Sequence, residues 1–233
     1  INQVAQTPGA KVQSAAQSSF DAWVKYYRQD ENTSNATVSY YSKGSLVALC
    51  LDLSLRKDGR NSLDAVMRTL WQRCAGGPMT ENDLLAVVTD LSGPALAKKL
   101  THWVHGTDNL PLKQLLQQHG IRYGKESASC IDQLGLKLIE QQGLRVKTVL
   151  RASPAEDAGF AAGDEWLGVE VGDGKSSQAW RLMRLDDLAL YIGDARTCLA
   201  LIARDQRLLT LTLKIPPVSH QTNLAIADPK CVD

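Results

Sequence analysis

The sequence predicts a multi-domain α+β protein in which an all-helical first unit is followed by a β-rich second unit. Apolar residues recur at spacings of three and four up to about Tyr123, and at alternate positions beyond it. The apolar fraction of 44% in 233 residues is enough to bury two cores. We therefore divide the chain into a tail or loop over 1–18, a helical unit over 19–123, a β-rich unit over 127–215 and a C-terminal tail over 216–233.

Composition excludes several classes of protein. With 26 basic and 25 acidic side chains the net charge is +1, so no nucleic-acid partner is predicted. No apolar run approaches the roughly 18 residues of a membrane span, so no membrane partner is predicted either. The five cysteines are odd in number and widely spaced, which favours a reducing, cytoplasmic location over a disulfide framework. Because the chain begins with Ile1 and not Met, we expect it to be cut from a longer protein.

The helical unit is expected to begin with a short helix capped by Ser19, followed by a polar loop over 29–37. The next helix begins near Ser39 and ends near Lys57. Its apolar face is formed by Leu46, Leu49, Cys50 and Leu53. Its other face carries Gly44, Ser45 and Ala48, small residues that would let another segment approach closely.

Four more helices are predicted from start and stop residues. They begin at Ser62, at Thr80 with Asp83 as a capping box, at Pro94 and at Pro111.

Alternating apolar positions predict the strands of the β-rich unit, with one helix over 185–192. The predicted strand positions are 136–138, 144–149, 167–171, 198–203 and 208–213.

The segment Gln133-Leu134-Gly135-Leu136 has the form of a carboxylate-binding loop before a strand. With the short helix and glycine turn of 153–159 and the run 162–169, it makes 127–215 resemble a PDZ domain. The resemblance implies that a C-terminal peptide adds as a strand between 135–140 and 185–192, with Leu134, Gly135 and Leu136 as peptide-binding residues. The alternative is that Gly135 only makes a turn and that the protein itself fills the groove.

Several stretches of the helical unit resemble the C-terminal half of the glycyl aminopeptidase family; they are 20–32, 38–44, 52–56, 62–68 and 106–112. Members of that family are zinc-dependent metallopeptidases of the gluzincin type, with a thermolysin-like catalytic domain followed by a PDZ domain. The resemblance implies that residues 19–123 are a subdomain of such a catalytic domain. It also implies an aminopeptidase whose substrates are peptides with a small (Gly or Ala) N-terminal residue.

The family's zinc ligands, an H-E-x-x-H helix and a later glutamate, have no counterpart in this chain. His102 and His105 lie three apart without the intervening Glu, and His119 precedes a glycine, so we interpret all three as surface or packing residues. We therefore assign no metal ligand, and expect zinc only in the intact parent enzyme. The chain alone is predicted to be inactive.

The resemblance implies a catalytic role for Tyr41, within Tyr41-Ser42-Lys43-Gly44. In related enzymes a tyrosine in a Tyr-x-Lys-Gly context directs its hydroxyl at the tetrahedral intermediate. A phenol with a pKa near 10 is protonated at neutral pH and can donate to an oxyanion. Tyr40 is the runner-up, since a helix start displaced by one residue would exchange their directions. Lys43 could pair with a nearby carboxylate, but we interpret it as a solvated side chain.

Two functions are therefore carried forward. The first is the C-terminal part of a zinc aminopeptidase acting on a peptide or protein substrate. The second is a non-catalytic PDZ adaptor that binds peptides and uses the helices only as a scaffold.

Overall fold

The computed structural model describes residues 1–57, 59–127, 131–172, 176–217 and 220–226. The chain forms two compact units. The described residues of Ile1–Arg28, Ala36–Gly124 and Thr222–Asp233 form the first, and those of Gln29–Asn35 and Lys125–Gln221 form the second. Helices and antiparallel strands are both present, as the predicted α+β class requires.

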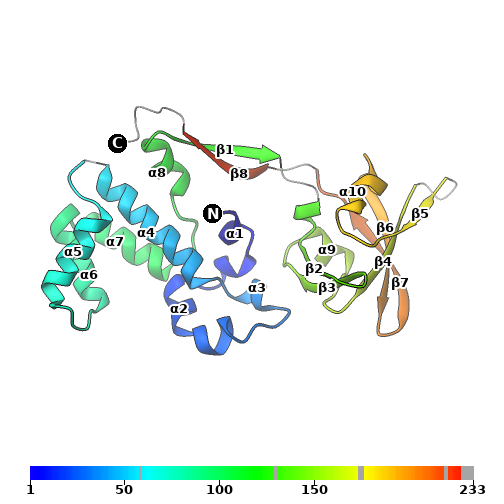
Figure 1. The fold of residues 1–233 in the computed structure, drawn as a ribbon, viewed down its shortest axis with the longest axis horizontal. Coiled ribbons are helices and arrows are strands. Elements are labelled where there is room, and N and C mark those ends of the chain that lie inside the picture. The colour runs from blue at the N-terminus through cyan, green and yellow to red at the C-terminus, as the bar shows by residue number, and fades with distance from the viewer. Residues whose placement is uncertain (58, 128–130, 173–175, 218–219, 227–233) are drawn as a thin grey trace. The chain divides into compact units, whose positions relative to one another are not determined.

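In the first unit the long helix α4 packs against α2, α5, α7 and α8, and α6 joins α5 and α7 (Figure 1). Buried residues of these helices, including Cys50, Val66, Val88 and Leu100, form one core. The helical elements are α1 (Asn2–Ala5), the 3₁₀ turn η1 (Pro8–Lys11), α2 (Ala15–Phe20), the π-helix η2 (Ala22–Tyr26), α4 (Tyr40–Arg56), α5 (Leu63–Cys74), α6 (Glu81–Ser92), α7 (Pro94–His105) and α8 (Leu112–Gln118).

The first 18 residues differ from the predicted tail, because they form α1, η1 and most of α2. Ser14, and not Ser19, caps α2: its Oγ accepts from the N–H of Gln17 at 3.1 Å, and the Gln17 side chain accepts from the Ser14 N–H. The polar composition of this segment predicts a loop, but the capping box at Ser14 and the close packing at Gly9 order it. A Cβ on Gly9 would lie 2.1 Å from the carbonyl oxygen of Thr37, so only glycine fits there.

The later helix starts are confirmed. Thr80 and Asp83 form the expected capping box, Pro94 is the first residue of α7, and Pro111 precedes α8. Ser62 precedes α5 but makes no side-chain cap; the N–H of Leu63 donates instead to Oδ1 of Asp52 at 2.8 Å.

The second unit contains a six-stranded sheet in the order β2-β3-β4-β6-β7, with β5 also paired to β4. Every pairing in it is antiparallel. Its elements are the 3₁₀ turn η3 (Ile131–Gln133), β2 (Leu136–Glu140), β3 (Leu144–Val149), α9 (Pro154–Ala158), β4 (Glu165–Val171), β5 (Gln178–Arg181), α10 (Asp187–Ile192), β6 (Thr197–Arg204) and β7 (Arg207–Lys214). The unit has its own core around Trp166, Leu188 and Ile202.

The residues of β4 that are buried differ from those that the alternating pattern predicts. Trp166 and Val169 are buried and Leu167 is not, because the register against β6 shifts between Trp166 and Gly168. A Cβ on Gly168 would lie 2.6 Å from the carbonyl oxygen of Trp180, which explains the glycine at this irregularity. Strand β5 was not predicted.

The sequence predicts a loop over 29–37, yet α3 (Thr33–Ala36) lies within it, and Gln29–Asn35 belong to the second unit. The Asn35 side chain pairs with β3 and the residues after it: Nδ2 donates to the carbonyl of Val149 at 2.8 Å, and Oδ1 accepts from the N–H of Arg151 at 2.8 Å. Lys137 Nζ also donates to Ser34 Oγ at 2.8 Å. One carboxamide thus satisfies two backbone groups of the second unit.

The C-terminal residues 216–233 were predicted as a tail, but β8 (His220–Ile226) forms a two-stranded sheet with β1 (Ile121–Ser127). Residues 218–219 and 227–233 lie outside the described part of the chain.

Cys50, Cys74 and Cys198 are free thiols, and burial raises the pKa of Cys50 to about 12 and that of Cys198 to about 11. The other two cysteines, Cys130 and Cys231, fall outside the described residues. Among the helices that the structure describes, none combines the length and the apolar character needed to span a bilayer.

Candidate functional site

The first turn of α4 holds the candidate catalytic residue. Ser39 caps the helix, its Oγ accepting from the N–H of Ser42 at 3.2 Å and its carbonyl accepting from the N–H of Lys43 at 2.8 Å. Tyr40 and Tyr41 are therefore the first two helical residues. The side chain of Tyr41 is 62% exposed, whereas Tyr40 is half-buried.

Tyr41 belongs to a tyrosine cluster formed by Tyr26, Tyr27, Tyr40 and Tyr41. The hydroxyl of Tyr27 lies 3.1 Å from that of Tyr40 and 3.3 Å from that of Tyr41. The rings of Tyr40 and Tyr41 are 4.2 Å apart between centroids, and Tyr26 packs edge-on against Tyr27 and Tyr40. The end of η2 and the start of α4 thus bring three hydroxyl groups together.

Hydrogen bonding within the cluster shifts two phenol pKa values in opposite directions. The bond with Tyr27, and then that with Tyr40, lowers the pKa of Tyr41. The bond with Tyr27, and then that with Tyr41, raises the pKa of Tyr40.

An exposed aromatic face lies on the same short stretch of chain. It comprises Trp23, Tyr27 and Tyr41, which are 80%, 51% and 62% exposed, and Phe20 and Val24 nearby in the sequence are exposed as well. The rings of Trp23 and Tyr27 are in contact, with centroids 5.1 Å apart. Apolar side chains gathered in this way are typical of a surface that another segment or molecule covers.

The interpretation of Lys43 as a solvated side chain is wrong. Only 3% of it is exposed, and its Nζ donates to the carbonyls of Ala10, Gln13 and Gly106, each at 3.2 Å. Burial lowers the pKa of Lys43, and the Asp108 carboxylate opposes that shift. The spacing of Lys43 with Leu46, Val47 and Cys50 is that of one helical face, and this pattern could have predicted its burial.

The small residues on the other face of α4 are predicted to let another segment approach, and at Gly44 the structure differs from this prediction. A Cβ on Gly44 would have no described atom within 4 Å, so none of the described segments approaches closely there.

Each of the three candidate histidines has a partner. His102 Nε2 lies 3.0 Å from Asp108 Oδ2, His105 Nε2 lies 2.8 Å from Glu81 Oε1, and His119 Nε2 lies 2.8 Å from the carbonyl of Leu53. Within the described ranges, His, Cys, Asp and Glu side chains nowhere gather in threes in a way that could hold a metal ion.

The loop expected to bind a peptide carboxylate lies between η3 and β2. Gly135 has a φ of +75°, and a Cβ there would lie 2.2 Å from Cβ of Ser153, so the position requires glycine. The N–H of Leu134 already donates to the carbonyl of Ile131 at 3.1 Å, so it is not available to an anion, and its side chain is in the core. Leu136 begins β2 and pairs with Val149.

The sheet edge next to this loop has a suitable position for an added strand. In the described sheet β2 pairs only with β3, so it is an edge strand. The Glu140 carboxylate accepts from the N–H of Leu185 at 3.2 Å, which holds the segment before α10 near the end of β2.

Comparison with known proteins identifies a family and a solved structure that the chain resembles. A sequence model of the M61 glycyl aminopeptidase family matches residues 1–47, which include the tyrosine cluster and Lys43. A solved structure of an aminopeptidase N family protein from Idiomarina loihiensis superposes with a TM-score of 0.83 and 26% sequence identity. That superposition covers 99% of this chain but 42% of the solved chain.

No curated protein sequence matches the chain. The family match lies on the residues that build the first turn of α4 and its surroundings, and the fold match extends over nearly the whole chain. The resemblance to the glycyl aminopeptidase family that the sequence motifs indicate is therefore confirmed, over residues 1–47, by the match to the M61 family.

Proposed function

We propose that this chain is the C-terminal part of a zinc-dependent aminopeptidase that removes small N-terminal residues, Gly or Ala, from peptides. In this proposal the first unit supplies a catalytic tyrosine, and the second is a PDZ-like domain. The observation that carries the proposal is the position of Tyr41. Its hydroxyl lies on an exposed face, at a capped helix start, inside the segment that matches a peptidase family.

The proposed role of Tyr41 is to donate a hydrogen bond to the oxyanion that forms when the peptide carbonyl is attacked. Such a donor must be held in place before the reaction, because reorganisation in the transition state costs free energy. The Ser39 cap and the contacts with Tyr27 and Tyr40 support this role, since they restrict the ring of Tyr41.

The described residues of this chain do not fit a zinc site, since no set of three suitable ligands comes together. When bound, zinc in such peptidases supplies an activated water and polarises the carbonyl. In our proposal residues outside this chain hold that metal. The exposed aromatic face around Tyr41 supports this division, because it offers apolar surface for another segment to cover.

The test is Tyr41→Phe in the full-length protein. We expect kcat to fall at least about ten-fold, and up to about 10²–10³-fold, because one oxyanion donor is lost. Zinc content, measured by elemental analysis, should not change. Tyr40→Phe is the matched comparison, since it removes the neighbouring hydroxyl and should lower kcat less. A normal kcat in Tyr41→Phe would remove Tyr41 from the mechanism.

The second candidate function is that of a peptide-binding adaptor, and the edge position of β2 favours it. A peptide added along β2 would hydrogen-bond to its open edge, next to the glycine turn at Gly135. NMR titration with peptides that have free C-termini should then shift the amides of 134–138, and unchanged spectra would argue against binding. An H-E-x-x-H segment encoded upstream of Ile1 would decide for the enzyme.

A further inference from the structure

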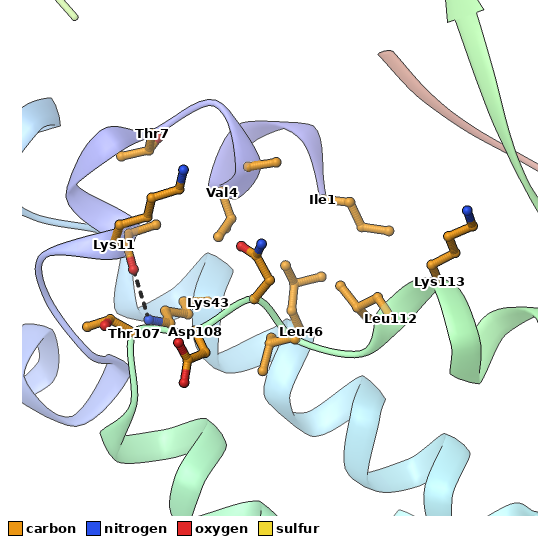
Figure 2. Close-up of a pocket in the computed structure, with 14 residues that line it drawn as sticks. Ile1, Val4, Thr7, Lys11, Lys43, Leu46, Thr107, Asp108, Leu112 and Lys113 are labelled. Carbon is orange, nitrogen blue, oxygen red and sulfur yellow. Dashed lines mark hydrogen bonds between the residues drawn. The ribbon is translucent and has the colours of Figure 1, made fainter. Parts of the chain in front are cut away.

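Lys43 has an unusual environment for a lysine. The ammonium group has three N–H donors, and each has a backbone carbonyl acceptor at 3.2 Å. The side chain is 3% exposed, and its Nζ is surrounded by these backbone carbonyls. A buried charge is costly unless hydrogen bonds satisfy it, so this arrangement holds Lys43 in one place. Figure 2 shows its ammonium beside Asp108 and Thr107, at a pocket of about 360 Å³.

The three acceptors come from separate parts of the first unit. Ala10 lies in η1, Gln13 precedes α2, and Gly106 follows α7. Two further contacts hold the residues that lead into α4: Gly9 lies against the Thr37 backbone, and Ser18 Oγ donates to the carbonyl of Val38. The start of α4 is thus attached on several sides to the segment from η1 to α2.

Lys43 and Tyr41 lie on opposite sides of the same helical turn. Residues two apart in an α-helix are separated by about 200°. Accordingly Lys43 is 3% exposed and Tyr41 is 62% exposed. A rotation or shift of this turn would move the Tyr41 phenol by a similar distance, and the hydrogen bonds of Lys43 oppose such a movement.

We propose that Lys43 is a positioning residue for Tyr41. By its hydrogen bonds to three carbonyls it fixes the rotation and the depth of the first turn of α4, and thereby the direction of the Tyr41 hydroxyl. The proposal rests on the proposed function, in which that hydroxyl donates to the oxyanion. It assigns the lysine of the Tyr-x-Lys-Gly motif a role that neither a solvated side chain nor an apolar core residue could fill. An arginine would also fail, because its planar fork does not match three acceptors around one point.

The test is a double-mutant cycle in the full-length protein, with Lys43→Met, Tyr41→Phe and the double variant. Methionine keeps approximately the volume of lysine but donates no hydrogen bond. We expect Lys43→Met to lower kcat about ten-fold or more with KM changed less than about two-fold, since the oxyanion forms only in the reaction. In the Tyr41→Phe background the same substitution should change kcat less than about two-fold.

A structural readout accompanies the kinetics. In this chain, with ring-labelled tyrosine, NOEs between Tyr41 and Tyr27 should be present in the wild type and lost in Lys43→Met. Asn61→Ala is the matched control. It removes a partly buried hydrogen bond to a backbone carbonyl, from Nδ2 of Asn61 to Leu91 at 2.8 Å, in another part of the first unit. It should keep both the NOEs and kcat.

The outcomes separate the two proposals. An equal loss of kcat from Lys43→Met in both backgrounds would overturn the positioning role and leave Tyr41 as the donor. A normal kcat in Tyr41→Phe would overturn the proposed function, and retained NOEs in Lys43→Met would overturn the positioning role independently. If Lys43→Met does not fold, Lys43→Arg keeps the charge. It should lower kcat about three-fold or more when Tyr41 is present and less than about two-fold when it is absent.

Discussion

The candidate site of the helical unit and that of the β-rich unit are built in different ways. Tyr41 lies on a face of exposed aromatic side chains and is not part of the core that holds its helix. The loop at Gly135 is packed against Ser153, and Leu134 is part of the second core. The first site is therefore open on its exposed side, whereas the second is largely enclosed by its own unit.

The difference also extends to the charged residues that support each unit. Lys43 has three carbonyl acceptors and supports one helical turn. In the second unit the fully buried Asp164 accepts two bonds from Arg204, at 2.7 and 2.8 Å, and one from the N–H of Ala161. That bidentate pair joins β6 to the turn before β4, and so supports the fold of the sheet and not a site on its surface.

The largest expected effect comes from Arg204→Met, which leaves the Asp164 carboxylate buried without its partner. Removing one member of a buried pair costs about 3–5 kcal/mol of unfolding free energy. Arg145→Met is the control, because the Arg145–Glu165 pair is exposed and is worth about 0–1 kcal/mol. Urea denaturation of the chain measures both. Equal, small losses of unfolding free energy from the two substitutions would mean that Arg204 does not pair with a buried Asp164 carboxylate as described.

Gly135→Ala is expected to cost about 2–4 kcal/mol, because a left-handed φ and a clash with Ser153 add. Gly163→Ala separates the two causes, since Gly163 also has a positive φ, +92°, but open space at its Cβ. It should lose about half as much in the same denaturation experiment. If Gly135→Ala costs no more unfolding free energy than Gly163→Ala, the loop at Gly135 does not pack against Ser153 as described.

The smallest effect is expected from Gly44→Ala on the open side of α4. In the isolated chain it should raise the unfolding free energy by about 0.5–1 kcal/mol, since alanine favours a helix and meets no described atom. Thermal melting of this chain and kinetics of the full-length protein should be compared. A stabilised chain with a lower kcat in the full-length protein would show that another segment uses the space at Gly44. A destabilised chain would contradict the open surface.

Much of the architecture could be predicted because it depends on local patterns. Capping at Thr80, proline at helix starts and alternation in the strands are determined by residues a few positions apart. The predictions failed where distant segments meet. The close packing of Gly9 and the Ser14 cap order helices in a segment that the sequence predicts as a tail. The irregularity at Gly168 changes which residues of β4 are buried. Local reading also missed β5 and β8, because strand pairing decides whether such short segments are ordered.

By itself the sequence determined the order of a helical and a β-rich unit, the position of α4 and the resemblance to a peptidase family, since each rests on spacing along the chain. Only the tertiary structure decided how the ammonium on the buried side of the first turn of α4 finds its acceptors. The ammonium of Lys43 is inside because three carbonyls, 30 to 63 positions away, converge on it, while the hydroxyl of Tyr41 remains outside beside Tyr27. Such convergence depends on packing between segments, which no local pattern encodes.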